Sequence, residues 1–553
     1  MFDRAFSIDQ NCHPLWDVVP KLAALAHESV GAVHFIEDVD MAFSAPGAKV
    51  DEPELRLARE RYHRSGGADW GAAVFYSEFL GRVPVNIRNW EPLTGMSTSA
   101  LAKQLGRSVD DLYDEFSPSD NWQLIGSSYV GDRQHHRTIG DLTVRETREP
   151  LRRILDIARE DTLRRLPDPE ARERTEAWFA AEGARLDDLL ERHAAGSLVD
   201  LYRAWLAAWL HSGVEVRLSS ELFGLDADGP MALLDYFVRD YPTAARLYNE
   251  SLAEAGSELR PLDTDAGELP FFGAFRHQGH AVRAVAYLEG GSMRLADRSF
   301  PLEDGGLPLR ALRQAGVMSL AGKAVVLALQ ARMGDGGARL ALPHRGSLYI
   351  PASHRLGSKL LARRARSAVA AKRLPDGWQP VLRVRFRLLD RMRELSTTLD
   401  LPDHLAAWFG RARVSAADLG AHWADAMAEA KSRLAAFRTA DGRAQWQQQA
   451  CGDLAKRRGE LDSLRRRLAE EDPKQPRIRE VSREVKAVET ELLERTVRRI
   501  DADTQLAELD YWDSRGALLP WCVALGGESF YRDIVARAEL SEETPAGESA
   551  AWS

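Results

Sequence analysis

The sequence predicts an α/β fold, with a Rossmann-like core, a large helical insertion and a C-terminal antiparallel coiled-coil arm. Three observations predict it. A helical pattern over 16–31, which ends in Gly31, is followed closely by the apolar segment 32–36, and this is the alternation of an open α/β sheet. Residues 146–256 are almost wholly helical in pattern, and strand-like segments return after them. Heptad-type spacing over 454–492 indicates two paired helices.

Composition places the chain among soluble globular proteins. Its 553 residues exceed one compact core, so we expect roughly two to four structural units. Apolar residues make up 44% and charged residues 28%, and the net charge of −9 disfavours nucleic acid as a partner. The three cysteines are far apart, which excludes a disulfide framework and fits a reducing compartment. No apolar segment is long enough for a signal core or a membrane span, so we expect a cytoplasmic protein that contacts no membrane.

The patterns divide the chain into five regions. Strands in regions one and three are expected to build one core together, with the helices of region two inserted between them. The boundaries are 1–145 (first part of the core), 146–260 (helical insertion), 261–400 (second part of the core), 401–510 (helical region with the coiled-coil hairpin) and 511–553 (C-terminal segment with a flexible tail).

Several individual elements follow from local patterns. The residue patterns predict a strand over 82–90, a strand and turn over 346–355, and a β-hairpin over 280–300 around Glu289-Gly290-Gly291. A helix is expected over 309–333. The polar, glycine- and serine-rich loop 117–141 contains His135 and His136, and it is either a functional loop or a surface excursion.

The arm is predicted from leucine and valine spacing. In the first predicted helix the apolar residues are spaced 7, 3 and 4 positions apart, at Leu454, Leu461, Leu464 and Leu468. In the second they are spaced 4, 3 and 4 positions apart, at Val481, Val485, Val488 and Leu492. Pro473 and Pro476 cannot lie inside one continuous helix, so the chain must turn between the two helices. Acidic and basic residues are mixed on both helices, which favours a homodimer through the arm over nucleic-acid binding.

Three carboxylates follow the predicted strand in the segment AVHFIEDVD. Alternation places Asp38 and Asp40 on one side and Glu37 on the other. Such a cluster is stable when it is solvated or neutralised. The alternatives are a divalent metal site, a ligand amine or hydroxyl deprotonated by one acid, and a solvated strand end with an Asp capping the next turn. Glu37, Asp38 and Asp40 are therefore the candidate catalytic residues, as general base or metal ligands.

A second candidate cluster is basic. His344-Arg345 and His354-Arg355 flank the predicted strand 346–355, and Lys359 lies on the basic helix that follows. These groups suit a small molecule that carries a carboxylate or phosphate, and we take all five as candidate substrate-binding residues. The alternative is a surface helix whose cations pair with the excess acid of the chain.

Near the N-terminus, Cys12 and His13 are adjacent. Side chains of adjacent residues diverge, so we do not propose a Cys–His nucleophile. His13 is a further candidate substrate-binding residue at the entrance of the first helix, and a capping or packing role is the alternative.

Two of these segments resemble a known family. The chain resembles the bacillithiol-biosynthesis cysteine-adding enzymes (cysteine ligases) and uncharacterised bacterial relatives in the strand and acids VHFIEDVD and in the preceding helix HPLWDVVPKLAALA. It also resembles the closing segment of these enzymes in LLPWCVALGGESFYRDIV. Val39 stands where that family has a histidine, and QNCHP replaces its glutamine-containing segment. The resemblance implies a Rossmann-like core with a coiled-coil arm. It also implies an activity that joins an amino acid or similar nucleophile to a sugar- or carboxylate-bearing small molecule.

The leading hypothesis is therefore a cytoplasmic, dimeric ligase or transferase that joins an amino acid or similar nucleophile to an anionic or sugar-like small molecule. A nucleotide or a divalent metal is the class of cofactor that we consider. The alternative is a non-catalytic scaffold or regulatory coiled-coil protein with a degenerate ligand pocket. Nucleic-acid binding through the helix 355–373 is a third hypothesis, which predicts an affinity that falls steeply with salt.

Overall fold

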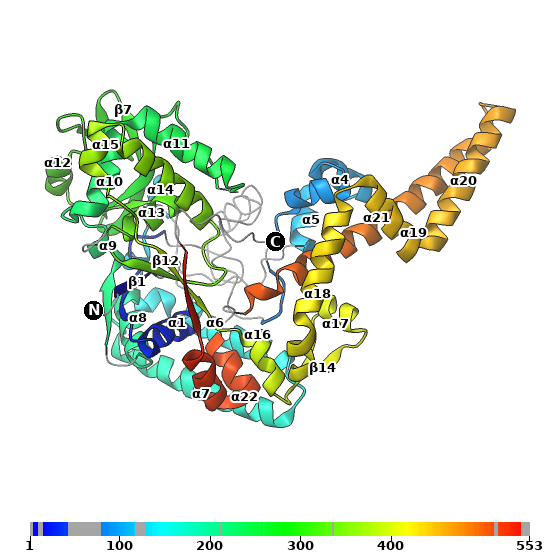
Figure 1. Cartoon of the computed structure of the whole chain (residues 1–553), viewed down its shortest axis with the longest axis horizontal. Helices are drawn as coiled ribbons and strands as arrows, with labels where there is room; N and C mark the ends of the chain where they lie inside the picture. Colours follow the sequence, from blue (N-terminus) through cyan, green and yellow to red (C-terminus); the bar gives the residue numbers. More distant parts are fainter. Residues whose placement is uncertain are drawn as a thin grey trace.

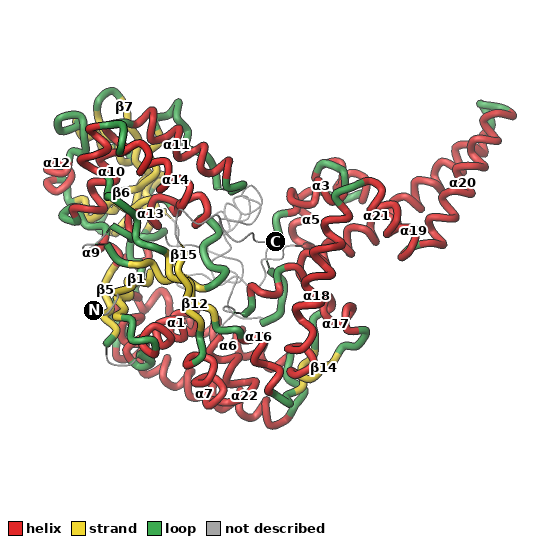
Figure 2. Tube along the Cα trace, in the orientation of Figure 1, coloured by secondary structure: helices red, strands yellow, loops and turns green. Residues whose placement is uncertain are grey.

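The computed structural model describes most of the chain and shows an α/β lobe joined to a helical lobe from which an arm extends (Figure 1). The strands of both large sheets lie in one lobe, whereas the other lobe is helical apart from a short hairpin (Figure 2). The described residues are 4–8, 15–41, 79–83, 85–116, 129–210, 213–257, 259–333, 337–513 and 518–543.

The first sheet has six strands in the order β15-β12-β11-β1-β2-β5, and the α/β class predicted from the sequence is confirmed. All neighbouring pairs are parallel except β12 with β15, which is antiparallel. Taken in chain order, the five parallel strands stand as 3-2-1-4-5. The strands are β1 (Arg4–Ile8), β2 (Gly31–Ile36), β5 (Val214–Leu218), β11 (Arg339–Pro343), β12 (Val381–Arg385) and β15 (Glu539–Glu543).

Helices cover both faces of this sheet. On one face lie α1 (Leu15–His27), α8 (Leu198–Ala207) and α22 (Leu518–Ala536), and on the other lie α13 (Ala324–Ala331) and α14 (Ile350–Arg364). The predicted first helix and the strand after it are confirmed as α1 and β2. In α1 the buried residues Trp16, Val19, Leu22 and Leu25 recur every third position, which gives one apolar face toward the sheet.

The second sheet is antiparallel and follows the order β10-β6-β7-β4-β3, with β8 and β9 continuing from β7. Helices α10 (Asp228–Arg239), α11 (Tyr241–Glu254), α13, α14 and α15 (Ala368–Arg373) share its apolar core. The strands are β3 (Tyr129–Val130), β4 (Asp132–Arg137), β6 (Glu268–His277), β7 (His280–Glu289), β8 (Ser292–Leu295), β9 (Arg298–Pro301) and β10 (Val317–Gly322). The predicted hairpin at 280–300 is confirmed as β7 and β8.

The remaining helices connect the two lobes and build the helical one. Within the α/β lobe and along its base lie α6 (Val144–Arg164), α7 (Pro169–Arg192), α9 (Ser219–Leu222), α12 (Leu309–Gln314) and α16 (Leu388–Arg391). The helical lobe contains α3 (Glu91–Thr94), α4 (Thr98–Leu105), α5 (Val109–Phe116), α17 (Asp403–Phe409), α18 (Ala416–Phe437) and α19 (Ala440–Ala450), with the hairpin β13 (Thr398–Asp400) and β14 (Arg413–Ser415). Short 3-10 turns are η2 (Ile87–Trp90), η3 (Ile139–Asp141), η5 (Met392–Glu394) and η6 (Leu509–Tyr511).

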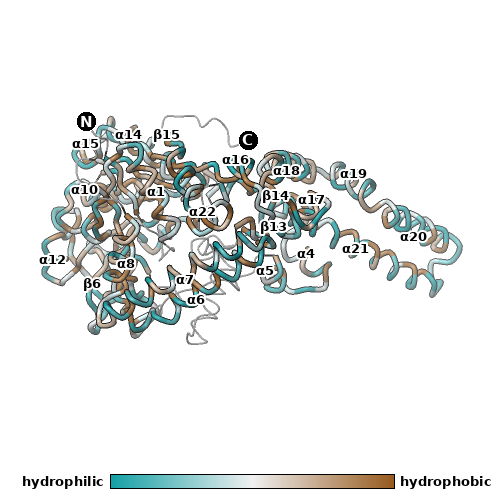
Figure 3. The backbone as a smooth tube through the Cα atoms, turned by 90° about the horizontal axis from the view of Figure 1, so that it is seen from below, coloured by the Kyte–Doolittle hydropathy of each residue, from teal (hydrophilic) through white to brown (hydrophobic). Residues whose placement is uncertain are grey.

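The arm consists of α20 (Gly452–Glu471) and α21 (Pro476–Ala507), and the chain turns between them at 472–475. The two helices pack side by side through Leu468, Val481 and Val485, with Leu461 and Leu464 half-buried beside them. Seen from two directions, the pair extends away from the rest of the molecule (Figures 1 and 3). Within the residues that the structure describes, none of the helices is both long and apolar enough to span a bilayer.

Four local predictions were wrong or incomplete. The segment 346–355 is a turn followed by the first residues of α14, because Pro351 at the second helical position favours a helix start. The segment 82–90 ends in η2, which Asn86 caps. The predicted helix 309–333 is divided into α12, β10 and α13, since Gly316 adopts a positive φ. The edge strand β5 interrupts the region expected to be almost wholly helical, and it was not predicted.

A buried carboxylate holds the helices under the parallel sheet together. Glu182 of α7 is 1% exposed, and its Oε1 accepts the indole N–H groups of Trp16 at 3.3 Å, Trp205 at 2.7 Å and Trp209 at 3.2 Å. Its Oε2 accepts from Arg185. One side chain therefore satisfies donors from α1, from α8 and from the residue two positions beyond α8.

We expect Glu182→Ala to lower the free energy of unfolding by about 3 kcal/mol or more, because two buried indole N–H groups and one half-buried one lose their acceptor. Glu182→Gln keeps an acceptor oxygen and should cost about half as much. Urea titration measures both. The control is Asp187→Ala on the same helix, which removes an exposed pair with Arg152 and should cost less than about 1 kcal/mol. Equal losses in Glu182→Ala and Asp187→Ala would contradict the assignment.

Candidate functional site

The carboxyl edge of the parallel sheet brings the two predicted clusters onto the same side of the molecule. The central strand β1 pairs Phe6 with Val33 of β2 on one side and with Leu340 of β11 on the other. Glu37 and His344 each follow four residues later, so they stand at one level on either side of β1. Two strand spacings separate β2 from β11, which places their backbones about 10 Å apart.

Asp38 and Asp40 hold the chain that leaves β2. The Asp38 carboxylate accepts from the Ser219 hydroxyl at 2.9 Å and from the Ser220 N–H at 2.8 Å, where α9 begins after β5. Asp40 pairs with Arg283 of β7, whose guanidinium lies 4.0 Å from the centre of the Phe272 ring. These contacts agree with the turn-capping alternative for the two aspartates. They tie the strand end to β5 and to the second sheet.

Glu37 differs from its two neighbours because its side chain is 5% exposed at the end of β2. Its level on the sheet matches that of His344, and strand alternation directs both side chains to the face covered by α13 and α14. Among the residues that the structure describes, no group of three or more His, Cys, Asp or Glu side chains is arranged to hold a metal ion.

His344 continues the pairing of β11 with β12, since its N–H donates to the carbonyl of Val384 at 2.9 Å. Burial lowers the pKa of His344 to about 4, and the charge of Arg385 acts in the same direction. The imidazole is therefore neutral near pH 7, and one ring nitrogen can donate a hydrogen bond while the other accepts one.

Arg345 and Arg385 attach the end of α21 to the sheet. Arg345 donates to both carboxylate oxygens of Asp510, at 2.6 and 2.7 Å, and to Glu508 at 2.6 Å. Arg385 donates to Asp513 at 2.8 Å. The segment that follows the arm is thus fixed against the carboxyl ends of β11 and β12 by charge-assisted hydrogen bonds.

The other predicted basic residues lie on α14, away from this edge. Lys359 contacts Glu250 at 3.1 Å and Glu254 at 2.7 Å on α11, and Arg355 lies 3.9 Å from Glu254. His354 is buried, and its Nε2 is 3.2 Å from Glu543. These contacts match the alternative in which the cations of the helix pair with acids of the chain. His13, together with Cys12, lies outside the described residues.

The histidines of the 117–141 loop lie in the second sheet. Residues 117–128 lie outside the described part, and His135 and His136 belong to β4. The His135 ring is stacked on that of His277 with centroids 3.7 Å apart, and Asp132 lies 3.0 Å from its Nδ1. These histidines belong to a different sheet from Glu37 and His344.

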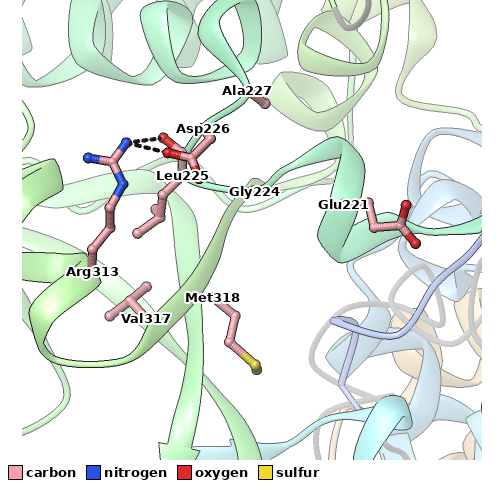
Figure 4. Close-up of a pocket in the computed structure, with 8 residues that line it drawn as sticks. All are labelled: Glu221, Gly224, Leu225, Asp226, Ala227, Arg313, Val317 and Met318. Atoms are coloured by element: carbon pink, nitrogen blue, oxygen red, sulfur yellow. Dashed lines mark hydrogen bonds and ion pairs between the residues drawn. The ribbon is translucent and has the colours of Figure 1, made fainter.

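A separate pocket lies beyond the β5 side of the sheet, between α9 and β10 (Figure 4). Its charged residues Asp226 and Arg313 pair with each other at 2.7 Å, and Glu221 points away from them (Figure 4). Met318 on its rim is 40% exposed. None of the predicted site residues lines this pocket.

Sequence reasoning missed several residues at the edge. Ser219 and Arg283 bind the aspartates, and Glu508, Asp510 and Asp513 bind the arginines. Ser219 could have been found, because the alternating residues Val214, Val216 and Leu218 directly before it form a short strand. The acids after α21 had no local signal, since their partners are more than 100 residues away in the chain.

Comparisons with protein-family models, with curated proteins and with solved structures find no match for this chain.

The lowered pKa of His344 predicts a pH effect on stability. The unfolded chain binds this proton near pH 6.5 and the folded chain only near pH 4, so stability rises with pH across that interval. We expect His344 to account for a loss of about 2 kcal/mol between pH 7 and pH 4. His344→Gln should remove that part of the pH dependence of the melting temperature. The exposed His422→Gln is the control, and identical profiles for wild type and His344→Gln would exclude the effect.

Proposed function

We propose that the chain is a ligase or transferase that joins an amino acid or similar nucleophile to an anionic or sugar-like small molecule at the carboxyl edge of the parallel sheet. The observation that supports this proposal is that Glu37 and His344 lie at the same height along the sheet, on the two sides of β1. In open α/β sheets, ligands bind outside the carboxyl ends of the strands, where the strand order reverses.

The proposal also includes a Rossmann-like core. The order 3-2-1-4-5 of the parallel strands supports it, as does the placement of α1 and α14 on opposite faces. With this topology the order reverses between β1 and β11. Of these two strands, β11 leads to His344, and β1 lies next to β2, which leads to Glu37.

Within the proposed site, Glu37 and His344 have different roles. Glu37 is the general base that accepts the proton lost by the amino group or hydroxyl as it attacks the second substrate. His344 is neutral near pH 7 and orients the anionic or sugar-like substrate through hydrogen bonds. Arg345 keeps the surrounding segment in place through Asp510. A nucleotide or a divalent ion remains the proposed class of cofactor.

A thermal-shift screen tests the proposal, because a ligand that binds only the native state raises the melting temperature. The probes are nucleotides, amino acids, thiols, sugar phosphates and divalent ions. We expect at least one class to stabilise the protein, by about 2.7 kcal/mol when its concentration is one hundred times Kd. If every class leaves the melting temperature unchanged, the scaffold alternative is supported.

For a ligand found in this way, Glu37→Gln should weaken binding about tenfold or more, because a charge-assisted hydrogen bond is lost. The control is Lys359→Gln, whose ammonium group pairs with acids of α11, and it should change Kd less than twofold. Isothermal titration calorimetry measures both. A large effect of Lys359→Gln with none of Glu37→Gln would move the site to α14.

The proposed arm is an antiparallel coiled coil through which two copies pair. Support comes from the apolar contacts between α20 and α21 and from their extension away from the rest of the molecule (Figure 3). Light scattering of the intact chain at micromolar concentration should give about twice the 61.6 kDa of one chain. A mass of one chain over the whole accessible concentration range would overturn the dimer.

A further inference from the structure

The C-terminal strand β15 is bound to the sheet through its acidic side chains. Glu539 accepts from Arg387 at 2.6 Å, Glu542 from Arg339 at 2.8 Å and Glu543 from Arg383 at 2.7 Å. Most residues of β15 are exposed or half-buried, so its attachment depends on the antiparallel pairing with β12 and on these ion pairs.

Glu543 differs from the other acids of β15 because both of its partners are buried. Arg383 is 7% exposed and His354 is 8% exposed, and they approach different oxygens of the same carboxylate. Burial opposes ionisation of Glu543, but the close contact with His354 and the charge of Arg383 prevail and lower its pKa to about 2. The buried Arg332 adds positive charge nearby. Glu543 is therefore ionised across the physiological range.

Arg383 carries this connection to the loop 344–349, which contains His344. Its Nη1 donates to the carbonyl of Gly346 at 2.7 Å and to that of Pro343 at 3.2 Å. His354 lies on α14, which begins directly after the loop at Ile350. The Glu543 carboxylate is thus connected to both ends of the loop, through Arg383 at the start and through His354 at the end.

Arg345 also holds the loop through Asp510 and Glu508, so Arg383 is one of two arginines that constrain it. Leu348 is 82% exposed, so this apolar side chain does not anchor the loop in the core. Ser347 has a φ of 61°, a conformation that a non-glycine residue adopts only when its surroundings impose it. Hydrogen bonds to the loop carbonyls supply that constraint.

From this geometry we infer that Glu543 and Arg383 are positioning residues for the loop 344–349, and that the C-terminal strand β15 fixes the place of His344 at the carboxyl edge. This inference rests on the proposed function, which puts His344 in the site. The inference assigns to β15 a role in a site whose other residues, Glu37 and His344, directly follow β2 and β11.

The test compares Glu543→Gln and Arg383→Met with the matched control Glu542→Gln. The control removes an acid of the same strand that pairs with Arg339 of β11, whereas Glu543 pairs with Arg383. Hydrogen exchange of the ligand-free protein should be at least tenfold faster at residues 346–350 in the two test variants and unchanged there in the control. His344 should titrate near pH 4 in the control and closer to its ordinary value near 6.5 in Glu543→Gln, as followed by NMR. In Arg383→Met the loss of a neighbouring positive charge raises the pKa of His344 by itself, so loop exchange is the deciding readout for that variant.

Two results would overturn the inference. One is an unchanged loop exchange in a folded Arg383→Met protein, or an unchanged His344 titration in Glu543→Gln. The other is an equal effect of Glu542→Gln and Glu543→Gln, which would indicate that only the attachment of β15 matters. If Arg383→Met does not fold, Arg383→Lys serves instead, because it keeps the positive charge opposite Glu543 but lacks the planar fork that serves both the carboxylate and the carbonyls. Both readouts need no ligand, so they remain informative if the proposed function fails.

Discussion

The parallel pairing of β1 with β11 joins two five-residue strands that lie far apart in the chain, and the candidate site takes its geometry from that pairing. Side chains alternate along a strand, so a shift of one residue would turn His344 to the opposite face from Glu37. The register is fixed by burial on both faces, since Phe6 and Leu340 pack in one apolar core and Ala5 and Ala341 in the other. Two hydrophobic cores therefore determine how one polar edge is arranged.

Ion pairs between distant segments hold the neighbouring parts of the chain against the carboxyl edge of the parallel sheet. The chain has an excess of acid, and buried or half-buried carboxylates of the later segments are matched by arginines in β12 and directly after β11. Removing one partner of such a pair would leave a buried charge, which is far more costly than the loss of an exposed pair. The ends of β11 and β12 thus receive Asp510 from the segment after α21 and Glu543 from β15. These contacts make the carboxyl edge dependent on parts of the chain that contribute no predicted ligand-binding group.

Local pattern was sufficient for the elements that are long or strongly periodic. The helix α1, the strand β2 and the hairpin of β7 and β8 were predicted because their periodicity is visible within a dozen residues. The strand β5 was missed because it is short, half-buried and placed between helices. The start of α14 was missed because alternating residues before Pro351 imitate a strand. The partners of Arg345 and Arg383 were beyond reach, since pairing of distant charges leaves no mark in either local segment.

The acidic segment after β2 illustrates how one sequence feature divides into separate tasks. Asp38 holds the start of α9 beside β5, and Asp40 holds Arg283 of the second sheet, so each carboxylate meets its own donor. Their mutual repulsion is reduced because each negative charge is matched locally. By fixing the backbone on both sides of the sheet edge, the two aspartates also determine where Glu37 stands at the end of β2. The charge cluster is therefore best understood as two structural anchors that position a third, buried acid opposite His344.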